Sequence, residues 1–238
     1  TGSSLDLTIT AYDIGNNVVT SYTGSKSLTF SGLANSPDGN IPTVEGVNLP
    51  GPVTVTFASG VSAALGATLI AAKVESTSLD VSDGTNTSNG SANYDLDLTV
   101  TVGSATKLKF TTPPPASVNA GVVWSSFAAG IFDLYGNPRI SAADINTITI
   151  TGDGAGSFSG TVFKAAVNGI AVFNDISYPQ VGAINVTASS TGFTSTPASA
   201  VTINPGTVSY LKLTAPSSSM TTGSSLDLTI TAYDIGNN

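Results

Sequence analysis

The chain contains one seventeen-residue segment twice, and this repeat constrains its fold more than any other feature. Residues 1–17 and residues 222–238 both read TGSSLDLTITAYDIGNN, so the sequence returns to its starting point after 221 residues. An identity of this length does not arise by chance and is typical of repeat architectures. We therefore expect the chain to be an internal piece of a longer or processed polypeptide.

A weaker repeat divides this period into two parts. Residues 107–113 (KLKFTTP) are similar to residues 210–216 (YLKLTAP), and each segment precedes a glycine, a strand-like run and a turn that begins with aspartate. The spacing predicts three modules of the size of Ig-like domains. They are an Ig-like module lacking its first strand at 1–103, a complete module at 104–206, and the first two strands of the next module at 207–238.

The incomplete ends leave two interpretations open. In the first, the chain is a window on a longer tandem array, and its partners are the adjacent repeats. In the second, the C-terminal segment completes the first module of a neighbouring molecule by strand complementation. The long identity favours the array, because strand exchange does not require the second strand to be duplicated. Both interpretations make copies of this sequence the expected partners, joined end to end.

Alternation of apolar and polar residues predicts strands in many segments. In residues 5–11 (LDLTITA) and 94–102 (YDLDLTVTV) every second side chain is apolar, so Leu5 and Leu7 are expected to face inward. The same pattern occurs at 53–57, 108–110, 148–150, 184–188 and 201–203. Turns rich in Gly, Pro, Asn and Asp separate these segments, and no helical period is sustained. The expected fold class is all-β, with tandem Ig-like β-sandwiches in a rod-like array.

The composition excludes several kinds of chemistry. The chain has no His and no Cys, so it offers no Ser–His pair, no thiolate nucleophile, no zinc ligand set and no disulfide. We therefore expect no enzyme activity. Its 7 basic residues stand against 15 acidic ones, for a net charge of −8, so nucleic acid is not an expected partner.

Membrane and location signals are limited. The most apolar run, residues 61–72, would cover about 18 Å as a helix, which is short of a hydrocarbon core of about 30 Å. We expect no membrane span in this segment. The sequence is rich in Ser, Thr, Asn and Gly and poor in Lys and Glu, which favours an extracellular or cell-surface location.

The order of motifs in the second predicted module carries a family resemblance. Leu-x-Phe-x-x-Pro at 108–113 is followed by Phe-Asp-Leu-Tyr-Gly-Asn at 132–137 and by Gly-Ile-Ala-Val-Phe-Asn-Asp-Ile at 169–176. This order resembles the bacterial Ig-like repeats of the invasin/intimin group and of giant surface adhesins. The first predicted module departs from the pattern through an insert at 33–52.

The resemblance implies a function outside the cell and no catalytic residues. The expected function is that of a structural repeat unit in a secreted fibre, stalk or surface layer. The alternative is an adhesin whose Ig-like modules bind a glycan or protein ligand on another surface. The matching motifs are mostly turn and core positions, so they specify the fold better than the function.

Four aspartates are candidate calcium ligands, because Ca²⁺ prefers clustered carboxylate and carbonyl oxygens. Asp13 and Asp133 begin the same Asp–Gly–Asn turn, which recurs at Asp234, whereas Asp80 and Asp83 flank a predicted hairpin loop. An Asx turn with a glycine at positive φ is the favoured interpretation of the first group, since one carboxylate per loop is a thin ligand set. No other cofactor is expected.

Two further groups of residues are candidates for surface chemistry. Asn86, Asn89 and Asn185 begin Asn-x-Ser/Thr triplets and are glycosylation candidates. The aromatic residues of the second predicted module are candidates for stacking on a sugar; they are Trp124, Phe127, Phe132 and Tyr135. Phe127 aligns with Leu7 and is expected in the core, whereas Trp124 and Phe132 are expected on the opposite face.

Overall fold

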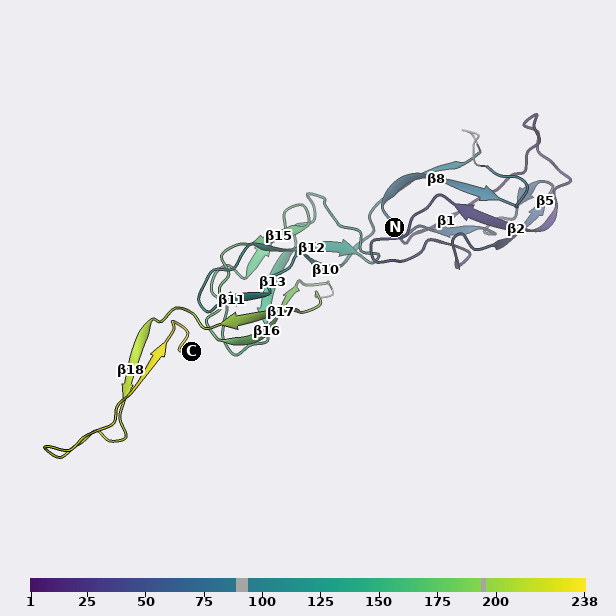
Figure 1. Cartoon of the computed structure of the whole chain (residues 1–238). Helices are drawn as coiled ribbons and strands as arrows, with labels where there is room; N and C mark the ends of the chain where they lie inside the picture. Colours follow the sequence, from purple (N-terminus) through teal and green to yellow (C-terminus); the bar gives the residue numbers. More distant parts are fainter. Residues whose placement is uncertain (89–93, 194–195) are drawn as a thin grey trace. The chain divides into compact units, whose positions relative to one another are not determined.

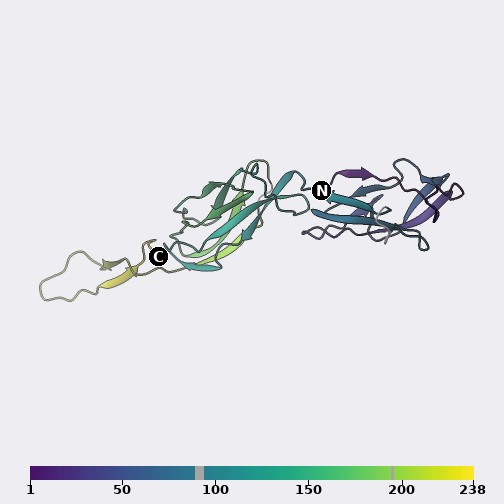
Figure 2. The same cartoon turned by 90° about the horizontal axis from the view of Figure 1, so that it is seen from above.

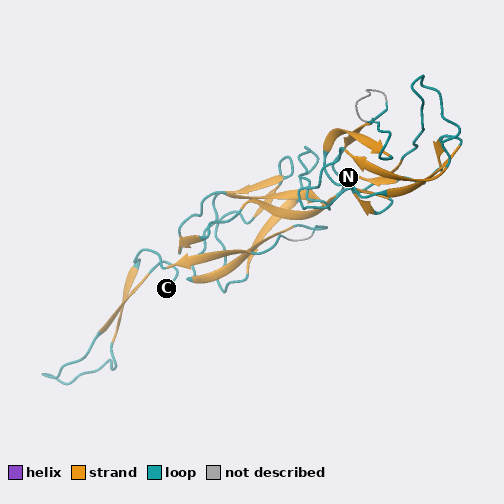
Figure 3. Cartoon of the chain, turned by 45° about the vertical axis from the view of Figure 1, so that its right-hand side comes forward, coloured by secondary structure: helices purple, strands orange, loops and turns teal. Residues whose placement is uncertain are grey.

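The computed structural model describes residues 1–88, 94–193 and 196–238 (Figure 1). All regular secondary structure in these residues is β-strand, which confirms the all-β fold class (Figure 3). Within the same ranges, no helix has the length and apolar character needed to cross a membrane. The chain forms two compact units: unit 1 comprises Thr1–Ala105 and Phe132–Pro138, and unit 2 comprises Thr106–Ile131 and Arg139–Asn238.

Unit 1 is a sandwich of two sheets. The four-stranded sheet has the order β1 (Ser4–Asp6), β7 (Thr68–Ile70), β3 (Thr43–Val44) and β4 (Val47–Asn48). The five-stranded sheet has the order β6 (Val61–Ser62), β5 (Val53–Ala58), β2 (Gly24–Ser31), β8 (Glu75–Ser82) and β9 (Leu96–Val100). The departure from the family pattern at 33–52 supplies β3 and β4, and the strand pairs of both sheets are antiparallel.

The core of unit 1 lies between its two sheets. Val53, Val55 and Phe57 of β5 are buried and alternate with exposed residues, as the sequence predicted. They pack with Phe30 of β2, and Leu69 of β7 closes the core from the other sheet. Burial of these side chains is the main source of stability in such a sandwich.

Unit 2 is also a sandwich and carries an additional hairpin. Its three-stranded sheet has the order β10 (Ala105–Thr112), β12 (Phe127–Asp133) and β15 (Ile170–Phe173). Its five-stranded sheet has the order β11 (Ser117–Asn119), β17 (Ser199–Asn204), β16 (Gly182–Ser189), β13 (Thr147–Gly152) and β14 (Phe163–Ala165). The hairpin consists of β18 (Tyr210–Thr214) and β19 (Thr229–Tyr233), joined by a long loop (Figure 2).

Aromatic side chains dominate the core of unit 2. Phe127 stacks on Phe173, with ring centroids 5.4 Å apart, and it is buried as the sequence predicted. Trp124 is buried as well and meets Phe158 edge to face at 5.5 Å. The expectation that Trp124 lies on the opposite face is therefore wrong, because its ring completes the core between Phe127 and Phe158.

The predicted strand at 5–11 is wrong in one respect. Leu5 was expected inside but is 44% exposed, and β1 ends at Asp6. The reason is a change of partner: β1 pairs with β7 in one sheet, whereas Thr10 forms a bridge to Val61 of the other sheet. A chain that switches sheets bends between them, so one alternation does not continue through both parts.

The segment at 94–102 also differs from its prediction. It forms β9 at an edge of its sheet, and Tyr94 and Leu96 are exposed although the pattern placed them inside. Leu98 and Val100 are half-buried on the same strand. The exposed side chains of Tyr94 and Leu96 line a groove of unit 1.

Candidate functional site

One five-residue loop recurs three times with the same internal geometry. We call loops 13–17, 133–137 and 234–238 the Asp-to-Asn loops. In each, Oδ1 of the first-position aspartate accepts hydrogen bonds from the backbone N–H groups two and four positions further on, at 2.9–3.0 Å. The fifth-position asparagine donates from its Nδ2 back to the same carboxylate, at 2.8–3.2 Å.

The backbone of each loop adopts a left-handed conformation at the same position, whichever residue type occupies it. The fourth residue has positive φ in every copy: 62° at Asn16, 81° at Gly136 and 64° at Asn237. The sequence predicted that glycine would fill this role, but only Gly136 does so. Asparagine tolerates the left-handed region better than most residues, which allows the substitution.

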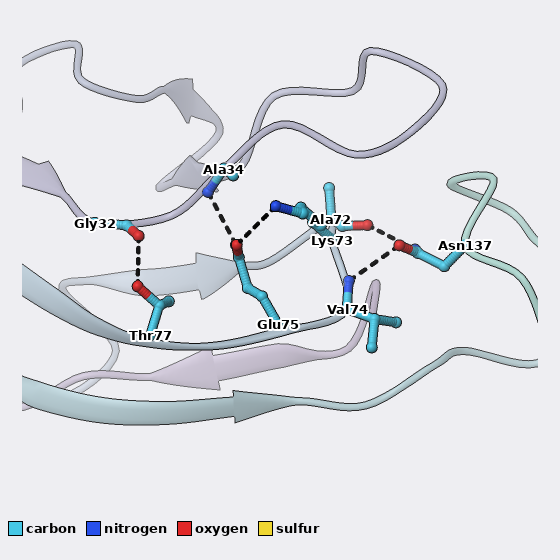
Figure 4. Close-up of polar contacts among 8 residues, drawn as sticks. All are labelled: Gly32, Ala34, Ala72, Lys73, Val74, Glu75, Thr77 and Asn137. Carbon is cyan, nitrogen blue, oxygen red and sulfur yellow. Dashed lines mark hydrogen bonds and ion pairs between the residues drawn. The ribbon is translucent and has the colours of Figure 1, made fainter.

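Loop 133–137 is clasped by backbone groups of unit 1. Nδ2 of Asn137 donates to the carbonyl oxygen of Ala72 at 2.9 Å, and Oδ1 of Asn137 accepts from the N–H of Val74 at 3.0 Å (Figure 4). Oδ2 of Asp133 accepts from the N–H of Gly103 at 3.1 Å and from the hydroxyl of Thr1. Both loop side chains are only 1% exposed, so the contact is buried.

The segment that receives Asn137 is itself fixed by polar contacts. Glu75 forms an ion pair with Lys73, with Nζ and Oε2 3.3 Å apart, and its Oε1 accepts from the N–H of Ala34 at 2.9 Å (Figure 4). The hydroxyl of Thr77 donates to the carbonyl oxygen of Gly32 at 2.8 Å. These contacts tie the start of β8 to the end of β2 and hold the backbone that Asn137 recognises.

Loop 234–238 makes the same set of contacts inside unit 2. Nδ2 of Asn238 donates to the carbonyl oxygen of Pro179 at 2.7 Å, and its Oδ1 accepts from the N–H of Val181 at 2.9 Å. Oδ2 of Asp234 accepts from the N–H of Gly206 at 2.7 Å. We call this arrangement of one asparagine amide and one carboxylate on three backbone groups the loop clasp.

Loop 13–17 has the internal geometry of the other two loops but a different environment. Its five residues are all exposed, whereas Asp234 of the identical segment is buried. Its side chains contact the rest of unit 1 through Asn16, whose Oδ1 accepts from the hydroxyl of Tyr94 at 3.2 Å. The loop is therefore preformed and presents its carboxylate and amide at the surface.

The clasp lowers the pKa of its aspartates. Burial by itself raises the pKa of Asp133, but hydrogen bonds from Thr1, Asn137 and Gly103 outweigh burial and hold the pKa below the usual value. In Asp234 the hydrogen bond from Gly206 is the largest cause of a lowered pKa. These carboxylates are ionised hydrogen-bond acceptors at neutral pH.

The lowered pKa of Asp133 predicts an acid-sensitive unit 1. The pKa of an aspartate in the unfolded chain is about 3.9. The stabilisation is complete above that pH and is lost as the pH falls through the lower pKa of the folded state, because the unfolded chain binds the proton first. We expect the unfolding free energy of the natural chain to fall more between pH 7 and pH 2 than that of Asp133→Asn. Denaturant titrations across this range measure the difference, and equal pH slopes would contradict it.

The calcium candidates lie in two separate places. Asp83 holds its own loop: Oδ1 accepts from the N–H groups of Thr85 and Asn86, and Oδ2 accepts from the hydroxyl of Tyr22 at 2.8 Å. The N–H bonds of Asn86 lower the pKa of Asp83, and burial with the Asp83 contact raises the pKa of Tyr22 to about 12. The carboxylate of Asp80 faces Ser88 at 3.5 Å.

In these contacts the carboxylate oxygens of Asp80 and Asp83 accept hydrogen bonds from N–H and O–H groups, which differs from a set of ligands around a metal ion. Within residues 1–88, 94–193 and 196–238, no group of three or more acidic residues is placed to hold a metal ion. The carboxylates of Asp13 and Asp133 are directed at N–H groups, which fits a turn better than a cation. A calcium site at Asp13, Asp80, Asp83 or Asp133 remains a prediction from the sequence.

The glycosylation candidates differ in their surroundings. Asn185 lies on the polar face of β16 and is exposed, and its Nδ2 donates to Asp153 at 2.8 Å. The Nδ2 of Asn86 donates to Asp83 at 3.1 Å in an exposed loop. Asn89 lies outside the described residues. Modification at these positions remains a prediction.

Comparison with known proteins gives likenesses without a family. No family model matches the chain, and no curated protein does. The Escherichia coli adhesin FdeC is 18% identical over 100% of this chain and 70% of its own, with a TM-score of 0.42. Domains 4 and 5 of the S-layer protein SbsC are 15% identical over 55% of this chain and 66% of theirs, with a TM-score of 0.31.

A third likeness is to an enzyme. A β-glycosidase from Bacteroides vulgatus is 11% identical over 85% of this chain, with a TM-score of 0.37, and the chain spans 25% of its length. These three TM-scores lie below 0.5, which is too low to transfer a fold or a function to this chain.

Proposed function

We propose that this chain is a structural repeat unit of an extracellular fibre, stalk or surface layer made of tandem Ig-like domains. The observation that carries the proposal is the loop clasp, which occurs at loop 133–137 and again at loop 234–238 with equivalent donors and acceptors. An array needs a contact that recurs from one repeat to the next, because each repeat contacts only its neighbours. The exposed loop 13–17 supports a third contact of the same kind.

The proposed mechanism is mechanical, and it includes no catalysis. Backbone ladders in both sandwiches resist extension, and each clasp adds buried charge-assisted hydrogen bonds. The aspartates with lowered pKa values hold turns, so the proposal needs neither an enzyme site nor a cofactor. The partners are adjacent repeats or further copies of the chain, and nucleic acid is not among them. The composition supports a location outside the cell.

Electron microscopy of the native assembly tests this function. With about 30–40 Å per sandwich, one 221-residue period of two modules should give an axial repeat of roughly 60–80 Å. Regular end-to-end contacts with this spacing are the expected result. Isolated monomers that bind sugars on a glycan array would instead favour the adhesin, and they would overturn the structural assignment.

A further inference from the structure

Unit 1 contains a groove that opens into its own hydrophobic core. The groove has a volume of about 860 Å³. Leu7, Ile9 and Phe30 form part of its lining, and the exposed side chains of Tyr94 and Leu96 stand at its border. Apolar side chains in this position are normally covered by another element of the fold.

Unit 2 shows which element covers the corresponding position there. Asp133 corresponds to Asp13, so Phe127 of β12 corresponds to Leu7. In unit 2 the strand β10 lies directly beside β12, and Leu108 of β10 is only 1% exposed. Among the described residues of unit 1, no strand pairs with residues 7–12 in the way that β10 pairs with β12.

The C-terminal hairpin contains the missing type of strand. Residues 210–216 are the counterpart of 107–113, and β18 pairs antiparallel with β19. The side chains of Leu211 and Leu213 on β18 are 66% and 61% exposed, although Leu108, the counterpart of Leu211, is buried and Phe110, the counterpart of Leu213, is half-buried. The hairpin thus carries an exposed apolar face, and the groove runs beside the core of unit 1 with Tyr94 and Leu96 exposed at its border.

The pairing partner of β18 occurs twice in the chain. The sequence of β19, Thr229–Tyr233, is the same as that of residues 8–12. In unit 1, Ile9 and Ala11 use their backbone groups on one side, where Ser62 donates to Ile9 and Ala11 donates to Gly60. Neighbouring residues in a strand direct these groups to opposite sides, so Thr8, Thr10 and Tyr12 present theirs along the groove.

We infer that the groove of unit 1 binds the strand Tyr210–Thr214 of another copy of this sequence. This inference deepens the proposed function and rests on it. The hairpin supplies the register: Tyr210 lies opposite the residue equivalent to Tyr12, and Thr214 lies opposite the residue equivalent to Thr8. Leu211 and Leu213 then face the core beside Ala11 and Ile9, because directly paired residues share a face.

The exposed loop 13–17 fits the same partner copy. Its identical counterpart, loop 234–238, is clasped by Pro179, Val181 and Gly206. In the joined form, loop 13–17 of one copy takes this clasp on the other. Residues 1–17 replace the identical residues 222–238, so the ladder and the clasp are preserved. The gain is burial of Leu211 and Leu213 and of the exposed side chains of Tyr94 and Leu96 at the border of the groove.

Cysteine pairs in the full chain test the strand and its register, because the natural sequence has no cysteine. Paired residues in an antiparallel ladder have Cα atoms about 4.5–5.5 Å apart, which a disulfide can span. Under mild oxidation, Thr8→Cys with Thr214→Cys should give disulfide-linked dimers and longer ladders on a non-reducing gel. The off-register pair Thr10→Cys with Thr214→Cys should give only background linking, and Thr214→Cys with Thr229→Cys should link within one chain.

Two matched proline variants test whether residues 1–17 of one copy replace residues 222–238 of another. Each is made in the chain that carries Thr8→Cys and Thr214→Cys. Thr231→Pro removes an N–H group that faces β18 in the hairpin, so it should free the strand and increase linking between copies. Thr10→Pro makes the same change in the identical segment of unit 1 and should abolish linking. The double variant Leu211→Asp with Leu213→Asp should also abolish linking between copies. Both positions lie outside unit 1, so the groove itself is not changed.

The outcomes separate this inference from the proposed function. Linking within single chains by Thr8→Cys and Thr214→Cys, or equal linking in both proline variants, overturns the inference. If micrographs show end-to-end contacts while the pair does not link, the strand assignment fails and the repeat-unit function survives. Linking between copies in solution supports the strand assignment even if the native assembly lacks end-to-end contacts.

Discussion

Replacing Asn137 with alanine should destabilise unit 1 by about 3 kcal/mol. The substitution removes the two hydrogen bonds that join the amide to Ala72 and Val74, and it removes the amide donor to Asp133. Asn137 is buried, so the groups that it leaves behind have poor access to water, and each unsatisfied group costs about 1–3 kcal/mol. Calorimetry combined with hydrogen exchange of unit 1 peptides measures the loss.

The chain supplies its own control for this variant. Asn17→Ala removes the equivalent amide from the exposed loop 13–17, where only contacts within the loop are lost, so the cost should stay below about 1 kcal/mol. Asn238→Ala should resemble Asn137→Ala, and Trp124 reports on it because it is the only tryptophan and lies in unit 2. Equal losses for Asn17→Ala and Asn137→Ala would show that the clasp adds no stability.

Replacing Phe127 with alanine should lower the unfolding free energy of unit 2 by about 4 kcal/mol, since large-to-small changes in a closed core leave a cavity. Its ring contacts Phe173 at 5.4 Å, Trp124 at 6.0 Å and Phe110 at 6.3 Å. The transition is followed by Trp124 fluorescence during denaturant unfolding. The large effect is expected because aromatic rings surround Phe127 on several sides.

The matched variant in unit 1 should behave differently. Leu7 occupies the position equivalent to Phe127 but lines the open groove, so its side chain has fewer neighbours to lose. Leu7→Ala should therefore cost about 2 kcal/mol, at the low end for a buried leucine. A loss as large as that of Phe127→Ala would mean that the groove side of the core is as tightly packed as the closed one.

The sequence predicted those strands whose burial follows a local period. Residues 53–57, 148–150 and 184–188 became β5, β13 and β16 with the apolar positions buried. Alternation succeeds here because each strand has one face on a sandwich core from end to end. The signal needs no knowledge of which strand lies beside it.

Alternation could not predict what covers a face. It placed Leu5 and Leu96 inside, but Leu5 lies on β1, just before the chain changes sheet, and Leu96 borders the groove. Both outcomes depend on a partner strand rather than on the residue's own neighbours in sequence. The pattern of a strand therefore indicates which face suits burial, whereas exposure at such positions shows that no described strand covers that face.

The loop clasp was also beyond sequence reasoning, although its parts were visible. The recurrence of Asp and Asn predicted a turn in all three loops, and the turn is present. The receptors are backbone groups of Ala72 and Val74, which lie more than sixty residues before Asn137. Every residue type carries such groups, so no composition or motif identifies them in advance.

The exposed loop 13–17 has a kinetic consequence. The hydrogen bonds within loop 13–17 are the same as those within loop 234–238, which is clasped. The backbone of loop 13–17 therefore needs no rearrangement before it binds the backbone groups of a clasp. Recognition by a preorganised surface loses little conformational entropy at the moment of contact. Growth of an assembly through this loop should resemble rigid docking, with a rate set by diffusion and orientation and with little lag for refolding of the loop.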